Sequence, residues 1–191
     1  MRSNCKPLPR RFFLHSPTVV APALIGKLLI RRQGGRERRA RIVETEAYLG
    51  QGDAAAHAAA GLTARTAILF GEPGRAYIYL IYGMYLCLNV STLPAGEAGG
   101  VLFRAAEEVG GEAAAGALRG ALTGPGRLTR GLGIGAALNG CDLTRRGPLY
   151  LADDGGVPPA IAVTARVGIR KAVELPYRYC WAGHAAVSRH H

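Results

Sequence analysis

Residues 77–91 read YIYLIYGMYLCLNVS and hold four of the eight tyrosines in the chain. Two runs of aromatic, aliphatic and β-branched residues flank Gly83, which predicts a β-hairpin that reverses there. Tyr82 falls at the turn, although hairpin tips usually carry Asn, Asp or Gly. Two interpretations are open: the Tyr82 ring folds back over its own hairpin, or the tip is a wedge that enters a flat partner.

The length of 191 residues favours one domain with a substantial hydrophobic core. We expect a single α+β domain over 1–191, with a mixed or antiparallel β core, surrounding helices and a protruding hairpin. Residues 1–12 and the last few residues are expected to be flexible. No run of 18 apolar residues occurs, and the basic N-terminus lacks an apolar signal core. The sequence therefore predicts neither a membrane span nor secretion.

The four cysteines stand far apart without C-x-x-C spacing, which argues against zinc and favours reduced thiols in a cytosolic protein. Charge is more informative, because the net charge is +11 and 21 of the 24 basic residues are arginine. A surface this basic attracts polyanions, and the planar guanidinium group suits phosphate. The composition favours a nucleic-acid partner. The alternative is that abundant arginine, alanine and glycine reflect genomic base composition.

Local signals predict further elements. Ser16 as the N-cap, Pro17 at the first helical position and Gly26 at the end predict a helix. A second hairpin is expected over residues 27–49, with its turn at QGG, residues 33–35. Alternation along its return strand predicts that one face carries four residues: Ile42, Glu44, Glu46 and Tyr48.

Two carboxylates and a tyrosine on one strand face suggest chemistry. A carboxylate on an apolar strand beside aromatic rings can act as a general base, because desolvation raises its pKa towards the working range. The alternative is a solvated strand face, especially for Glu44, and His57 in the following loop carries little meaning alone. Residues 124–127 begin a further helix, whose amides either hold a phosphate or simply start an ordinary helix after Pro125. Together with the basic surface and the aromatic hairpin tip, this face favours an enzyme that takes a base out of duplex DNA.

Seven stretches occur in an order that is characteristic of one family: PALIGKLLIRR (22–32), RIVETEAYLG (41–50), FGEPGRAYIYLIYGMYLCLNVST (70–92), VLFRA (101–105), GPGRLTRGLGI (124–134), ARVGI (165–169) and LPYRYCW (175–181). In these stretches the chain resembles the alkyladenine (3-methyladenine) DNA glycosylase family. The likeness runs through most of the chain.

The resemblance implies catalytic roles at the matching positions. Glu46 would be the general base for a water molecule that attacks the anomeric carbon. Arg104 and the backbone carbonyl of Val167 would help to hold that water. Neither a metal nor another cofactor is implied.

The resemblance also implies how DNA is bound. Tyr48 and His57 would contact the flipped base from one side and Tyr79 from the other. Asn89 would form the pocket floor and disfavour the 2-amino group of normal guanine. Tyr82 would be the wedge that intercalates through the minor groove.

The function implied is that of a monofunctional DNA glycosylase. It would flip alkylated or deaminated purines, of the 3-methyladenine, 7-methylguanine, hypoxanthine and ethenoadenine class, out of duplex DNA and hydrolyse the N-glycosidic bond. The three lysines lie outside the matched pocket stretches, which argues against a Schiff-base lyase step, so an abasic site would remain. We expect a monomer without an obligatory protein partner or a membrane, in the cytoplasm of a bacterium and associated with its nucleoid.

Two alternatives differ in their predictions. A non-catalytic damaged-DNA-binding module on the same fold, with Glu46 in a structural salt bridge, would bind lesions without releasing base. A small-molecule transferase or hydrolase would be active without DNA and would show no salt-sensitive DNA binding.

Overall fold

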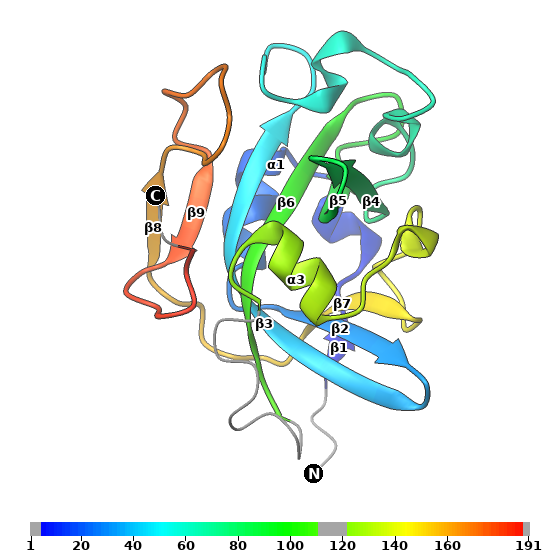
Figure 1. The fold of residues 1–191 in the computed structure, drawn as a ribbon, viewed down its shortest axis with the longest axis vertical. Helices are drawn as coiled ribbons and strands as arrows, with labels where there is room; N and C mark the ends of the chain where they lie inside the picture. Colours follow the sequence, from blue (N-terminus) through cyan, green and yellow to red (C-terminus); the bar gives the residue numbers. More distant parts are fainter. Residues whose placement is uncertain (1–4, 111–121, 189–191) are drawn as a thin grey trace.

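The computed structural model describes residues 5–110 and 122–188, whose strands form one curled antiparallel sheet. The strand order is β1-β7-β2-β3-β6-β5-β4, and β9 attaches to β3 and carries β8 at its outer edge (Figure 1). The strands are β1 (Lys6–Pro7), β2 (Leu28–Gln33), β3 (Arg36–Leu49), β4 (Ala76–Ile81), β5 (Tyr85–Thr92), β6 (Gly99–Glu108), β7 (Leu149–Asp153), β8 (Ile161–Thr164) and β9 (Arg178–Trp181). The described residues thus make one α+β domain.

The long strand β3 joins distant parts of the chain. β6 pairs along one of its edges, while the other edge is shared between β2 and β9. The turn between β2 and β3 consists of Gly34 and Gly35, both with positive φ, as a tight two-residue hairpin requires. The second half of β3 therefore has neighbours from both the middle and the end of the sequence.

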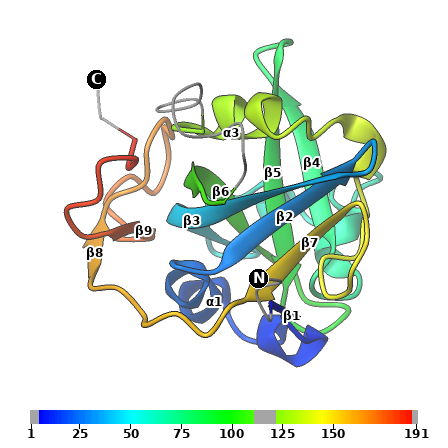
Figure 2. The same cartoon turned by 90° about the horizontal axis from the view of Figure 1, so that it is seen from below.

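Two α-helices of the described part pack against the sheet. α1 (Pro17–Leu24) begins at Ser16, whose hydroxyl accepts a hydrogen bond from the amide of Thr18, and α3 (Pro125–Gly131) begins after Gly124. α1 contacts β3 and β6, whereas α3 contacts β5 and β6. Figure 2 shows the two helices on opposite sides of the sheet. Short 3-10 helices are η1 (Arg10–Phe13), η2 (His57–Ala60), η3 (Ala67–Phe70) and η4 (Ala136–Leu138). In the described ranges no helix is long and apolar enough to cross a membrane.

The predicted alternation along β3 is wrong at Ile42. Ile42 belongs to the main core cluster together with Ala47, which places an even and an odd position on the same face. The pairing with β6 shifts register between Ile42 and Glu44 and again between Glu44 and Thr45. A β-bulge inserts an unpaired residue and changes the phase of the side chains, so Ile42 packs in the core while Glu44 does not.

The N-terminal segment differs from the expectation of flexibility. From Cys5 onward it is described and packed: β1 pairs with β7, and Cys5 and Leu8 are each only 4% exposed. The amide of Leu8 also donates to the carbonyl of Leu151. The burial of Cys5 and Leu8 and the pairing with β7 keep this N-terminal segment packed against the sheet. Residues 1–4 and 189–191 lie outside the described residues.

The hairpin of β4 and β5 ends in a tight turn. Tyr82 and Gly83 both have positive φ, 52° and 68°, and the amide of Met84 donates to the carbonyl of Ile81. These are the features of a type I′ turn, which matches the twist of the flanking strands. The tip extends beyond α3 in Figure 2, and the Tyr82 side chain is 77% exposed. The ring therefore does not fold back over its own hairpin.

Candidate active site

A cavity of about 620 Å³ opens between the end of β3, the β4–β5 hairpin and the loop after β8. Seven of the residues singled out in the sequence line it: Tyr48, His57, Tyr79, Tyr82, Asn89, Arg104 and Val167. The eighth, Glu46, forms hydrogen bonds to two of them, Tyr48 and Val167. The structure thus brings together residues that span 121 positions of the sequence.

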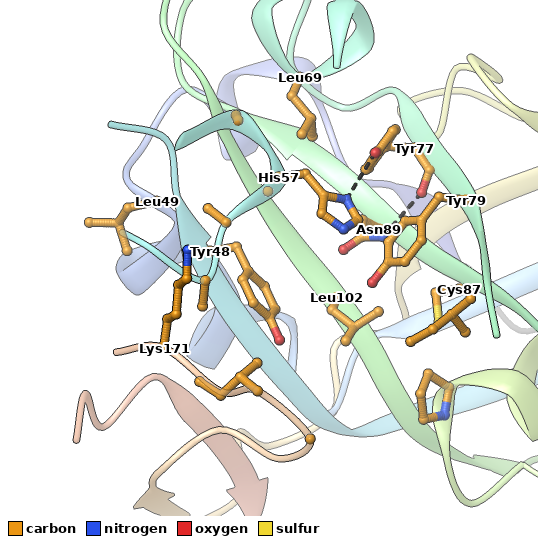
Figure 3. Close-up of a pocket in the computed structure, with 18 of the residues that line it drawn as sticks. Tyr48, Leu49, His57, Leu69, Tyr77, Tyr79, Cys87, Asn89, Leu102 and Lys171 are labelled. Carbon is orange, nitrogen blue, oxygen red and sulfur yellow. Dashed lines mark hydrogen bonds between the residues drawn. The ribbon is translucent and has the colours of Figure 1, made fainter. Parts of the chain in front are cut away.

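Aromatic side chains form opposite walls of the cavity. Tyr48 lies on one side, and Tyr77, Tyr79 and His57 lie on the other (Figure 3). The ring centroids of His57 and Tyr79 are 4.4 Å apart with an interplanar angle of 74°, and Nδ1 of His57 is 3.0 Å from the hydroxyl of Tyr77. His57 therefore shares a wall with Tyr79, whereas the sequence predicted it beside Tyr48.

Neighbouring groups determine the charge of His57 and the position of Asn89. Burial, together with the nearby positive charge of Arg65, lowers the pKa of His57, which favours a neutral imidazole at pH 7. Asn89 is 5% exposed, and its side-chain amide donates to the carbonyl of Tyr77 at 3.2 Å. It faces the cavity from β5, next to Leu102 of β6.

Glu46 is fully buried and contacts three residues that line the cavity: Tyr48, Arg104 and Val167. Its Oε2 accepts a hydrogen bond from the Tyr48 hydroxyl at 2.8 Å, and its Oε1 accepts one from the amide of Val167 at 2.7 Å. Nη1 of Arg104 is 3.4 Å from the same Oε1. Burial nevertheless raises the pKa of Glu46, because the desolvation penalty exceeds what these three partners offset.

Glu44 is just as buried, but its environment has the opposite effect. Its Oε1 accepts hydrogen bonds from Nε of Arg178 at 2.7 Å and from Nε of Arg104 at 2.9 Å. The amide of Ser188 donates to its Oε2 at 2.7 Å. Burial alone would raise the pKa of Glu44, but the Ser188 amide and the two arginines hold it below the usual value. The interpretation of Glu44 as a solvated position is therefore wrong.

The different environments of Glu44 and Glu46 suit the two carboxylates to different roles. Neighbouring acids whose surroundings push their pKa values apart are the usual arrangement when one acts as a base and the other supports the site. Arg104 links them, because it pairs closely with Glu44 and reaches Glu46 from the same guanidinium group. Glu44 thus anchors Arg104 next to Glu46.

A buried ion pair that the sequence reasoning missed holds the Tyr48 wall. Arg166 and Asp53 form two hydrogen bonds, of 2.6 and 2.8 Å, and both side chains are almost fully buried. Arg166 also donates to the carbonyl of Ala47 and lies 4.7 Å from the ring centroid of Tyr48. Because Arg166 precedes Val167, the pair fixes both Tyr48 and the amide that contacts Glu46. The partners are 113 residues apart, so no local pattern connects them.

Lys171 corrects one argument made from the sequence. The three lysines lie outside the matched pocket stretches, yet Lys171 lines the cavity, on the side of Tyr48 (Figure 3). It follows the 165–169 stretch in the loop between β8 and β9, whose residues 167–171 line the cavity. The position of the lysines therefore gives no argument against a lyase step. Within residues 5–110 and 122–188, no three His, Cys, Asp or Glu side chains are grouped so that they could hold a metal ion.

Fold and site together define a single-domain α+β protein with a pocket walled by aromatic rings and a buried carboxylate of raised pKa in contact with its lining. Residues 11–185 match the family described as "Methylpurine-DNA glycosylase (MPG)", and the chain belongs to this family. The match covers all eight residues that were singled out in the sequence.

Similar proteins agree with this assignment. One from Koribacter versatilis is 48% identical over 95% of this chain and 93% of its own length. One from Methanocella arvoryzae is 42% identical over 90% of each chain, and one from Anaeromyxobacter dehalogenans is 45% identical over 95% of this chain and 86% of its own. Each of these proteins is named "Putative 3-methyladenine DNA glycosylase".

Proposed function

We propose that this protein is a monofunctional 3-methyladenine DNA glycosylase, which flips a damaged purine out of duplex DNA and hydrolyses its N-glycosidic bond. The observation that carries the proposal is the pairing of a buried carboxylate of raised pKa with a pocket walled by aromatic rings. Family membership and the names of the relatives point to the same activity.

Glu46 is the general base of this reaction. It takes a proton from a water molecule whose oxygen bonds to C1′ of the deoxyribose, while the base leaves with the electron pair of the glycosidic bond. The transition state has oxocarbenium character, as in other glycoside hydrolyses. Arg104 and the carbonyl of Val167 hold the water, and the Val167 amide, 2.7 Å from Oε1 of Glu46, orients the carboxylate.

The leaving base lies between Tyr48 and the wall of Tyr79 and His57. A cationic alkylated purine gains about 0.5–2 kcal/mol from the electron-rich faces of such rings. Neutral hypoxanthine and ethenoadenine are substrates of the same pocket, but they depend on protonation or hydrogen bonding of the leaving base. Asn89 excludes normal guanine by opposing its 2-amino group.

Tyr82 fills the space that the flipped nucleotide leaves in the duplex. Four large side chains at the hairpin tip are exposed: Leu80 (54%), Tyr82 (77%), Met84 (68%) and Tyr85 (44%). Exposed apolar side chains on one hairpin suit insertion between base pairs. One chain carries the wedge, the pocket and the general base Glu46. The protein therefore acts as a monomer.

The test is incubation of the purified protein with duplex oligonucleotides that each carry one alkylated purine, one hypoxanthine or one ethenoadenine. Free base is measured by chromatography, and strand nicking is measured separately with and without alkali. The Glu46→Gln variant, prepared in parallel, controls for contaminating glycosylases.

The proposal predicts that wild type releases free base, that the variant does not, and that strands break only after alkali. Nicking without alkali, lost in a Lys171→Gln variant, would show a lyase and overturn the monofunctional assignment. Lesion binding without base release by wild type would contradict the glycosylase and leave a damage-binding module.

A further inference from the structure

A second cavity, of about 370 Å³, lies between the tip of the β2–β3 hairpin and the C-terminal end of α3. Arginines dominate its lining: Arg31, Arg36, Arg38 and Arg130. The remaining lining residues are Gln33 and the backbone segment 131–133, which includes Leu132. No role follows for this cavity from the reaction at Glu46.

The charge of this arginine pocket is poorly compensated. Arg38 pairs with Glu108 through two hydrogen bonds of 2.8 and 3.1 Å. Arg31, only 8% exposed, donates to backbone carbonyls, among them those of Gly133 at 3.2 Å and Pro148 at 3.0 Å. Arg31 forms no ion pair in the described part of the chain. A buried guanidinium group without a carboxylate is costly unless an anion accompanies it.

The two remaining arginines are exposed and available to an anion. Arg36 at the hairpin tip and Arg130 on α3 have no ion pair within residues 5–110 and 122–188. Counting the four arginines and Glu108, the pocket carries a net charge of about +3. Their guanidinium forks match the oxygen geometry of phosphate.

The position of the pocket connects it with the active site. Pro125 at the start of α3 lines the active-site cavity, and Arg130 at its end lines the arginine pocket. Five steps of about 1.5 Å make this distance roughly 7.5 Å, or about two base-pair steps of 3.4 Å along a strand. Arg127, also exposed and without an ion pair in the described residues, lies on the same helix between them. In Figure 2, α3 lies on the side from which the hairpin tip extends.

We propose that Arg31, Arg36 and Arg130 form a phosphate-binding site for the DNA backbone flanking the damaged nucleotide. Arg31 is the fixed, buried part of the site, and Arg36 and Arg130 close over the phosphate from the hairpin and from α3. The site positions the duplex without reading its sequence, as contacts to phosphate generally do. This inference rests on the proposed function, because it presumes that duplex DNA lies across the active-site cavity.

The experiment measures the affinity for a duplex with a stable abasic-site analogue, which is not hydrolysed, across a series of salt concentrations. The test variant is Arg36→Gln/Arg130→Gln. The control is Lys6→Gln/Arg11→Gln, which removes the same charge at two exposed residues in and just after β1, on the side opposite α3 in Figure 2. Each lost phosphate contact lowers the slope of log K against log salt by about 0.9.

The slope should therefore fall by about 1–2 in the test variant and stay at the wild-type value in the control. Equal slopes in wild type and test variant, or an equal fall in both variants, would overturn the proposal.

A second measurement begins with wild type alone, so its first result does not depend on whether the variant folds. Phosphates of the duplex are replaced one at a time by neutral methylphosphonate, and wild-type affinity should fall at one or two positions outside the lesion. At these positions the test variant should lose no further affinity, as expected of two groups in direct contact. If methylphosphonate at these positions lowers the affinity of the test variant as much as that of wild type, the assignment of the three arginines to a phosphate is contradicted. Base release by wild type, measured in parallel, separates failure of this site from failure of the proposed function.

Discussion

Glu44 and Glu46 are two positions apart on β3, face the same side and are both fully buried, yet their pKa values shift in opposite directions. The difference lies in the partners. Each carboxylate accepts a hydrogen bond from a backbone amide, but Glu44 has two arginines within 3 Å, whereas Glu46 has the Tyr48 hydroxyl and one arginine at 3.4 Å. The same residue type thus becomes an anchor at one position and a base at the other.

The first prediction concerns pH. Single-turnover release of a cationic base, such as 7-methylguanine, should fall as the pH drops through the raised pKa of Glu46, because a protonated carboxyl cannot accept a proton. In Tyr48→Phe the hydrogen bond that favours the charged carboxylate is lost while the ring remains, so the acid limb should move to higher pH. A pH–rate profile of wild type and Tyr48→Phe measures both effects. An acid limb at or below about 4.3, the ordinary pKa of glutamate, would contradict the prediction.

The second prediction compares the stabilities of two variants. Glu44→Gln should lower the free energy of unfolding by about 3–5 kcal/mol at pH 7, because Arg104 and Arg178 lose their shared carboxylate in the interior. Glu46→Gln should leave it unchanged or raise it, because the charged form of Glu46 is the one that burial disfavours.

Denaturant unfolding measures both variants, each serving as the control for the other. The pKa of Glu44 is lowered in the folded state, so its stabilising effect is complete above the unfolded-state pKa. The difference in the free energy of unfolding between wild type and Glu44→Gln should therefore shrink as the pH falls through the folded-state pKa of Glu44. Equal effects of the two substitutions would show that the environments do not differ as described.

At the scale of single elements, the turn of the β4–β5 hairpin is under strain. Tyr82 has a φ of 52°, a conformation that costs a bulky residue about 1–2 kcal/mol relative to one suited to it. Its side chain is exposed and offsets none of that cost by burial. A strained, exposed aromatic residue at a tip supports the proposed role of Tyr82 as a wedge.

The third prediction follows from this strain. Tyr82→Asn should keep the turn, since Asn tolerates positive φ, and should raise the stability by up to about 1 kcal/mol. Base release from duplex DNA should fall at least roughly tenfold, because the wedge is lost, while release from single-stranded DNA should change little. Val19→Ala, which shortens an exposed side chain on α1, is the matched control and should leave both activities at the wild-type level. Unchanged duplex activity in Tyr82→Asn would exclude the wedge.

Local elements were predictable where a short-range rule applies. Ser16 and Pro17 marked the start of α1, and the glycine turns marked both hairpins. The bulge beside Ile42 was not predictable, because it arises from pairing with β6, whose sequence lies far away. The side of the pocket on which His57 lies depends likewise on its hydrogen bond to Tyr77, which lies 20 residues further along the chain.

At the scale of the whole molecule, the curled sheet assembles the site from three distant regions. The Ser188 amide that holds Glu44 lies 144 residues away from it, and Arg166 lies 113 residues from Asp53. The family resemblance located Glu46, Tyr48 and Arg104, since each lies within a matching stretch. It did not reveal which groups hold them, because those contacts exist only in the folded chain.

The most direct test of the central claim, that Glu46 is the general base, is the single-turnover rate of base release by wild type and Glu46→Gln on the same lesion duplex. The affinity of each protein for that duplex is measured alongside. The account predicts a loss of about 10²–10⁴-fold in rate, with affinity within a few-fold of wild type. Release by Glu46→Gln at the wild-type rate would show that the carboxylate beside the aromatic pocket does not activate the water.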